Sequence, residues 1–202
     1  MTRRWTAVSS FLFALSCVCG TSLAADKSVD DLAKDGHWDP NKWEFHSQLI
    51  GKPAPELQLS EWVGDKEVKV DDMRGKILVV DFWATWCGPC IAAIPKNNAI
   101  AKKYADNGVL VIGACGSGRG EERMNEVATS KNMEYPTARV AASSTQAWGV
   151  QWWPHYVVVD REGKIRAAGI RPDAVEPIVK AIMAEQGDKP KTGQKSPGKR
   201  AK

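Results

Sequence analysis

Two cysteines separated by two residues are the positions of this 202-residue sequence best suited to chemistry. Cys87 and Cys90 enclose a Gly-Pro pair in the stretch DFWATWCGPC, which begins with Asp81. A pair with this spacing serves as a structural disulfide, as half of a metal site, as a haem attachment point or as a redox centre. The surrounding residues decide between these four roles.

Two of the roles fail on residue types. Covalent haem attachment requires a histidine directly after the second cysteine, and that position is Ile91. A structural zinc ion requires four ligands. Cys17 and Cys19 lie in a predicted N-terminal signal peptide, described below, and are removed with it. Apart from the pair, the remaining sequence offers only Cys115 and three scattered histidines, with no second closely spaced pair of ligands. We therefore expect the protein to hold no metal and no cofactor.

A redox role suits the pair better than a passive disulfide does. A disulfide across two intervening residues closes so short a loop that it gains little conformational entropy. A redox pair needs one exposed, reactive sulfur and a second sulfur within reach. A strand that runs into a helix at the pair supplies both, because the helix N-terminus favours the Cys87 thiolate and places Cys90 one turn further in. Pro89 fits the first helical turn, where its missing N–H costs nothing.

The elements that must position this pair follow from hydrophobic patterning. Continuous apolar runs predict buried strands, and helical spacing of apolar residues predicts helices. The predicted strands are 57–62, 68–70, 76–84, 109–115, 155–160 and 164–169, and the predicted helical segments are 91–108, 120–132, 145–150 and 173–186. The last helix requires Pro177 to lie in its first turn. This order predicts an α/β fold with one mixed sheet.

The motifs resemble those of a known family. VVDFWATWCGPC, with Pro95 five residues after Cys90, resembles the active-site strand, loop and helix of thioredoxin-fold proteins. With GKPAPEL upstream and GVQWWPHYVVVDREGKI downstream, residues 51–183 resemble the exported TlpA-like, or redoxin, thiol–disulfide oxidoreductases. The resemblance implies a thioredoxin-like fold with a central mixed β-sheet flanked by helices. The sequence departs from the usual pattern at Ala93, where many members have glutamate, and at Trp153, where Thr, Val or Ile is common.

The resemblance also implies roles for residues around the cysteines. Pro154 matches a cis-proline that lies against the CxxC, where a partner strand pairs with the preceding backbone. Trp153 then flanks the mixed disulfide or simply packs on the domain. The remaining predicted contacts to the partner are Trp86, Gly88 and Pro89.

Asp81 is an acid within an apolar strand, which is costly unless it is paired or used. It matches the family's buried carboxylate beneath the cysteines, where a raised pKa would let it accept the Cys90 proton. The alternative is an acid at a strand end that reaches solvent. Cys115 we expect to be a buried hydrophobe rather than a third reactive thiol.

The N-terminus predicts export. Arg3 and Arg4 precede a short apolar stretch at 5–20, and the small residues of TSLAA follow, which is the layout of a secretory signal peptide over residues 1–25. One alternative is an uncleaved N-terminal membrane anchor. A lipoprotein is another, but Ala14 rather than leucine stands three residues before Cys17, so the lipidation signal is poor. We expect a periplasmic protein.

The rest of the chain divides into three parts. Residues 26–48 read as an extended lead-in segment, residues 49–187 as the thioredoxin-like domain, and residues 188–202 as a disordered basic tail. The formal net charge is +4, to which Arg3 and Arg4 contribute +2 and the tail +5, so residues 26–187 carry −3. A slightly acidic body predicts no nucleic-acid binding, and we expect a monomer.

The favoured function is disulfide exchange with disulfide-containing partner proteins. The resemblance implies a reductant that is recharged by a membrane thiol donor. Peroxide reduction is a second candidate, but it requires Pro and Thr seven and three residues before the reactive cysteine, where this sequence has Val80 and Ala84. A non-enzymatic interaction domain that uses a surface rich in the nine tryptophans is a third.

Overall fold

The computed structural model describes residues 27–187. The predicted signal peptide and the predicted basic tail therefore lie outside the described residues. A six-stranded sheet with the strand order β1-β4-β3-β2-β5-β6 forms the centre of the fold. The strands are β1 (Leu59–Ser60), β2 (Ile77–Trp83), β3 (Val109–Cys115), β4 (Thr137–Val140), β5 (His155–Val159) and β6 (Ile165–Ile170). Strands β2, β3 and β4 run parallel, and the other pairings are antiparallel.

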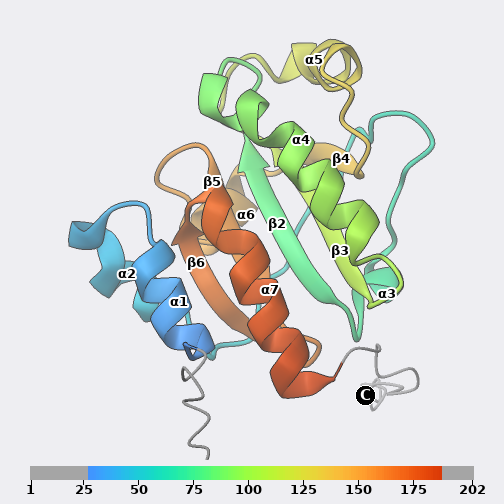
Figure 1. Cartoon of the computed structure of the whole chain (residues 1–202). Coiled ribbons are helices and arrows are strands. Elements are labelled where there is room, and N and C mark those ends of the chain that lie inside the picture. The colour runs from blue at the N-terminus through green and yellow to red at the C-terminus, as the bar shows by residue number, and fades with distance from the viewer. Residues whose placement is uncertain (1–26, 188–202) are drawn as a thin grey trace, which may run out of the picture.

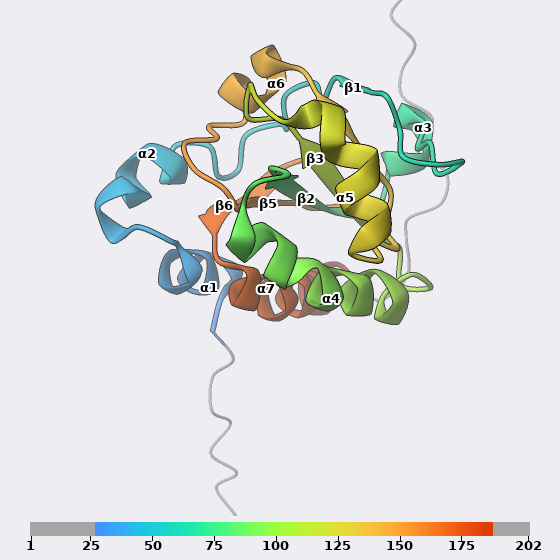
Figure 2. The ribbon, with the colours of Figure 1, turned by 90° about the horizontal axis from the view of Figure 1, so that it is seen from above.

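Helices cover both faces of this sheet. The helical elements are α1 (Val29–Gly36), η1 (Pro40–Lys42), α2 (Trp43–Ser47), α3 (Val70–Met73), α4 (Gly88–Lys103), η2 (Glu121–Arg123), α5 (Met124–Ser130), α6 (Ala142–Ala147) and α7 (Pro172–Gln186). Figure 2 shows α1, α4 and α7 side by side along one face, with α6 across the other. No helix within residues 27–187 is long and apolar enough to cross a membrane. The expected α/β fold with a mixed sheet is confirmed.

The central strand β2 has a core on each side because its side chains alternate between the two faces. Val79 and Trp83 pack into the core beneath α4 and α7, whereas Val80 and Phe82 pack into the core on the α6 side. This explains the uninterrupted apolar run in the sequence. At the end of β2 the chain turns directly into α4 (Figure 1), so the residues between them lie at one end of the sheet.

The expected extended conformation of residues 26–48 is wrong, because this segment forms α1, η1 and α2. The Ser28 hydroxyl caps α1 by accepting the N–H of Asp31. Val29 and Ala33, four residues apart, are buried among residues of α7 and β6. Only a few apolar positions mark this helix, and their burial partners lie more than 130 residues further along the chain. Sequence periodicity alone was too weak to reveal it.

Three smaller expectations also fail. The strand predicted at 57–62 is limited to Leu59 and Ser60, since Glu61 has a positive φ of 52°. The strand predicted at 68–70 is replaced by the start of α3, where the Asp72 carboxylate accepts the Lys69 N–H. Pro177 is the sixth residue of α7 rather than part of its first turn, and the buried apolar face of that helix outweighs the lost hydrogen bond.

Candidate active site

The two predicted cysteines form a disulfide at the start of α4, with an S–S distance of 2.06 Å. Cys87 is the N-cap of the helix, and its Sγ accepts the backbone N–H of Cys90 at 3.2 Å. Gly88 and Pro89 form the first helical turn between them and are exposed. The sulfur that caps the helix therefore lies where the unpaired N–H groups and the helix dipole favour negative charge.

The expectation of an exposed attacking sulfur is wrong for this disulfide form. Cys87 is only 3% exposed and Cys90 only 1%. Both cysteines belong to the core cluster, against which the partly buried Trp153 also packs. A reacting partner must therefore reach Cys87 past the side chains that surround it.

Asp81 lies in the middle of the fold, six residues before Cys87, and is 0% exposed. The alternative of a strand-end acid in solvent is thereby excluded. Its Oδ2 accepts hydrogen bonds from the Asn97 Nδ2 and the Tyr135 hydroxyl, each at 2.9 Å. The Asn97 amide also donates to the Tyr156 hydroxyl at 2.9 Å. The other carboxylate oxygen of Asp81, Oδ1, has no hydrogen-bond partner among the described residues.

The electrostatic result is a carboxyl group that titrates near neutrality. Burial raises the pKa of Asp81 from 3.8 to about 7, although hydrogen bonds from Tyr135, Tyr156 and Asn97 oppose the shift. Such a group is partly ionised at pH 7 and is able either to accept or to donate a proton.

Asn97, Tyr135 and Tyr156 are site residues that the sequence reasoning missed. Asn97 lies seven residues after Cys90 on the buried face of α4, so two turns of helix join the cysteine to the polar group that holds Asp81. An asparagine on an otherwise apolar helix face was the available signal. Tyr156 pairs with Asp81 across β5 and β2, which only the strand register reveals.

The aromatic rim of the site consists of Trp86 and Trp153. Trp86 is 48% exposed, and its ring meets that of Trp153 at 6.1 Å between centroids. Trp153 therefore both packs on the domain and borders the cysteine end of the sheet. The peptide bond between Trp153 and Pro154 is cis, as the resemblance implied, and Pro154 is buried.

The third cysteine is not part of this site. Cys115 ends β3 opposite Trp83 and is a free, buried thiol. Burial, followed by the nearby carboxylate of Glu121, raises the pKa of its thiol to about 12. A thiol that stays protonated is a poor nucleophile, which agrees with the expected buried hydrophobe.

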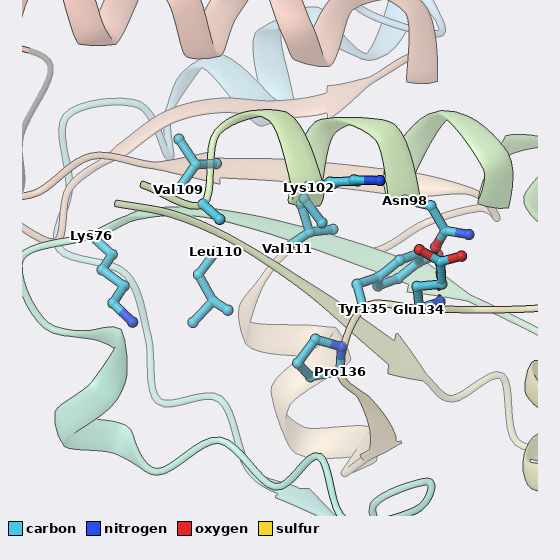
Figure 3. A pocket seen from close by; sticks show the side chains of 11 residues that line it. Lys76, Asn98, Lys102, Val109, Leu110, Val111, Glu134, Tyr135 and Pro136 are labelled. Atoms are coloured by element: carbon cyan, nitrogen blue, oxygen red, sulfur yellow. Dashed lines mark hydrogen bonds between the residues drawn. The ribbon is translucent and has the colours of Figure 1, made fainter. Parts of the chain in front are cut away.

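A hollow of about 360 Å³ lies away from the cysteines, between the C-terminal half of α4, β3 and residues 134–136. Figure 3 shows Asn98 beside Glu134, and the Glu134 N–H donates to the Asn98 Oδ1 at 2.9 Å. Of the residues that line this hollow, Tyr135 also belongs to the site, through its hydrogen bond to Asp81. Neither Cys87 nor Cys90 lines the hollow.

Comparisons with known proteins agree with this geometry. The Redoxin family model matches residues 49–183. Thiol-disulfide oxidoreductase ResA of Bacillus thuringiensis is 28% identical over 117 residues, which are 57% of this chain and 66% of the relative. This chain thus spans about two thirds of the length of that relative.

Solved structures show the same fold. The thioredoxin domain of a thiol–disulfide oxidoreductase from Bacteroides vulgatus superposes with a TM-score of 0.57 at 24% identity, covering 65% of this chain and 95% of that one. A candidate thiol:disulfide interchange protein DsbE from Chlorobium tepidum gives a TM-score of 0.55 at 26% identity, covering 66% and 97%. The chain therefore belongs to the Redoxin family, and it is a thioredoxin-fold protein of the ResA-like thiol–disulfide oxidoreductase type.

Proposed function

We propose that this protein is an exported thiol–disulfide oxidoreductase that reduces disulfides in partner proteins through Cys87 and Cys90. The observation that carries the proposal is the disulfide at the N-terminus of α4, where the Cys87 Sγ accepts the Cys90 N–H. The resemblance to a relative named thiol-disulfide oxidoreductase supports the same class of reaction.

The first step uses the reduced form of the pair. The Cys87 thiolate, favoured by the helix N-terminus, attacks one sulfur of the partner's disulfide. The partner's S–S bond breaks, a mixed disulfide with Cys87 forms, and the second partner sulfur leaves as a thiolate that takes up a proton. We assign Trp86, Gly88, Pro89, Trp153 and Pro154 to the surface that holds the partner during this step, with the partner strand pairing beside Trp153.

The second step releases the partner. Cys90 loses its proton to Asp81, directly or through a water molecule, and its thiolate attacks the Cys87 Sγ. The Cys87–Cys90 disulfide forms, and the partner leaves with its second thiol after taking up a proton. The partner disulfide has then gained two electrons and two protons. The pKa of about 7 and the unpartnered Oδ1 of Asp81 support its role as proton acceptor.

The direction of electron flow and the site of action belong to the same proposal. The oxidised pair returns to the dithiol by the reverse exchange with a thiol electron donor in the membrane. The N-terminal sequence pattern supports export to the periplasm. A reduction potential of the pair below that of the glutathione couple is expected of a reductant, and a potential well above it would contradict this direction.

Trapping with Cys90→Ser tests the proposal. The variant retains the attacking thiol but cannot release the mixed disulfide, so it should accumulate covalent complexes with periplasmic proteins that dithiothreitol dissolves. The wild-type protein should reduce insulin disulfides with dithiothreitol as electron donor, and Cys87→Ser should lose this activity by at least a hundredfold.

Cys115→Ala is the matched control, because it removes a cysteine that is buried and protonated. It should reduce insulin at the wild-type rate. If Cys87→Ser and Cys115→Ala behave alike, or if Cys90→Ser captures no protein, the assignment of a substrate-reducing pair is wrong. A non-enzymatic binding domain would instead retain its partners in a variant that lacks both Cys87 and Cys90.

A further inference from the structure

The loop at residues 116–121, which we call the rim loop, follows β3 at the cysteine end of the sheet. Its first residue is tied to the central strand, since the Gly116 N–H donates to the Trp83 carbonyl at 3.2 Å. Its last residue folds back, and the Glu121 Oε1 accepts the N–H groups of Ser117 and Arg119. Burial alone would raise the pKa of Glu121, but four backbone N–H groups hold it below its ordinary value. The loop is therefore braced by an ionised carboxylate.

The rim loop holds both tryptophans that border the cysteines. The Ser117 hydroxyl oxygen accepts the Trp86 indole N–H at 3.0 Å. The Gly116 carbonyl accepts the Trp153 indole N–H at 3.1 Å. The two indoles contact each other edge to face. The loop and the tryptophans thus form one connected wall beside the Cys87–Cys90 disulfide.

Arg119 belongs to the rim loop and contacts Trp86, and its guanidinium makes no ion pair with a carboxylate of residues 27–187. Its guanidinium lies 4.6 Å from the centroid of the exposed Trp86 ring, and the side chain itself is exposed. Within residues 27–187 it is the only arginine whose guanidinium makes no hydrogen bond or ion pair to a carboxylate or carbonyl oxygen. The others are Arg74, Arg123, Arg139, Arg161, Arg166 and Arg171.

The N–H groups of a guanidinium point outward in its own plane. When the guanidinium lies over an indole ring, they therefore remain available to a carboxylate. The wall also borders an open hollow of about 420 Å³, to which the rim loop contributes Gly116, Ser117, Gly118 and Glu121 but not Arg119. Trp153 and residues 139–142 and 145 complete its lining. The two charged groups in that lining are already satisfied, because Arg139 pairs with Glu61 at 3.0 Å and Glu121 braces the loop. Within the rim loop itself, the charged side chain without an ion-pair partner is Arg119.

We propose that Arg119 is a specificity-determining residue that selects partner segments with an acidic residue next to the reactive cysteine. The inference rests on the proposed disulfide-exchange function and adds the chemical class of its partner. The partner's chain lies across Trp86, and its carboxylate accepts hydrogen bonds from the Arg119 guanidinium. Glu121 is a positioning residue that acts through the backbone of the rim loop.

Two synthetic peptide disulfides test this. They share one sequence, except that the residues next to each cysteine are glutamate in one and glutamine in the other. We expect the reduced wild-type protein to react about two- to fivefold faster with the glutamate peptide at low ionic strength, the range of an exposed charge pair. This preference should shrink at high salt. It should disappear in Arg119→Gln and survive in part in Arg119→Lys, which retains the charge without the planar fork.

Arg123→Gln is the matched control. It makes the same change in net charge four residues away, where the arginine already pairs with Glu126, so the wild-type preference should remain. Equal rates for the two peptides in the wild-type protein, or an unchanged preference in Arg119→Gln, would overturn the inference while insulin reduction leaves the proposed function intact. Loss of all disulfide reduction by the wild-type protein would overturn the proposed function and the inference with it.

Discussion

Two buried polar clusters lie at the same level of the sheet but on opposite faces. Burial raises the pKa of the acid in one cluster and lowers the pKa of the histidines in the other. Asp81 pairs with Tyr156 across β2 and β5, and the next residues, Phe82 and His155, form the adjacent pair. Because neighbouring side chains in a strand point to opposite faces, Asp81 faces α4 while His155 faces the other side. One cluster is an acid held by neutral donors, and the other consists of histidines.

The histidine cluster joins the N-terminal helices to the sheet. The His46 Nε2 lies 2.9 Å from the Gly149 carbonyl, so this nitrogen must carry the proton. The His46 Nδ1 then accepts the Nε2–H of His37, also at 2.9 Å. Gly169, with φ of 68°, is needed beside them, because a Cβ there would lie 2.7 Å from the His37 Nε2.

The two clusters differ in how well they are satisfied. Asp81 receives two hydrogen bonds to one oxygen, whereas neither ring nitrogen of His155 has a partner among the described residues. Burial holds the pKa of His155 well below its ordinary value, and the neighbouring His46 and His37 add to this. Both clusters therefore carry little charge below about pH 7, because Asp81 retains its proton and the histidines release theirs.

Opposite pH dependences of stability follow from this difference. The unfolded chain ionises Asp81 above about pH 3.8 while the folded protein retains the proton up to about 7, so the contribution of this group to stability falls as the pH rises between these values. Unfolded histidines take up protons below about pH 6.5 while the folded cluster does not, so its contribution falls as the pH drops. Between pH 5 and 7 the two slopes oppose each other.

Asp81→Asn should break the comparison most strongly. The uncharged side chain retains the acceptor oxygen and avoids burial of a carboxylate, so the free energy of unfolding at pH 8 should rise by about 2–4 kcal/mol. The gain should vanish below about pH 3, where the acid is protonated in both the folded and the unfolded state. Insulin reduction at pH 7 should fall by at least about tenfold, because Cys90 loses its proton acceptor. Urea unfolding measures the effect on stability, and the turbidity of precipitating reduced insulin measures the effect on the reaction.

Asp160→Asn is the matched control for a buried acid. The Asp160 Oδ1 accepts the N–H groups of Glu162 and Lys164, and Oδ2 lies 3.5 Å from Arg166. Removal of this well-paired charge should destabilise the protein at pH 8 and leave insulin reduction unchanged. Both carboxylate oxygens of Asp160 have partners, whereas one oxygen of Asp81 has none. If Asp81→Asn and Asp160→Asn shift stability in the same direction, this difference does not explain the raised pKa of Asp81.

His46→Ala should be the most damaging change in the histidine cluster. It leaves the Gly149 carbonyl and the His37 N–H without partners and opens a cavity, so the free energy of unfolding should fall by about 2–4 kcal/mol. His155→Leu should cost less than about 1 kcal/mol or stabilise, since no hydrogen bond of the described protein is lost. Urea unfolding at pH 5 and 7 separates them, and equal losses would contradict the assigned hydrogen bonds.

Asn97→Ala should have a smaller effect that is specific to the acid cluster. Loss of the Asn97 donor removes a hydrogen bond that lowers the pKa of Asp81. This pKa should therefore rise from about 7 to a higher value. The midpoint of the pH–rate profile should move upward with it, with a stability loss of about 1–2 kcal/mol. Asn98→Ala, which removes exposed hydrogen bonds on the same helix, should leave the profile unmoved. A shift in both variants would indicate a general loosening of α4.

Much of the site was predictable because it is local in the chain. The strand that carries Asp81, the turn at Cys87 and the helix that begins at Gly88 lie within one continuous stretch, so residue spacing and apolar patterning indicate them together. The two central parallel strands were equally plain, because burial on both faces requires uninterrupted apolar runs.

The sequence by itself determined the CxxC, its strand and helix, the buried acid and, through resemblance, the proline at 154. Only the tertiary structure decided what surrounds them. Asn97 in α4 and Tyr135 in the loop before β4 donate to Asp81, and Tyr156 in β5 accepts a hydrogen bond from Asn97. The histidine cluster joins residues as far apart as 46 and 149. The pKa of a buried group depends on which distant residues desolvate it and donate to it. No spacing in the sequence records those neighbours, because chain folding rather than chain order brings them together.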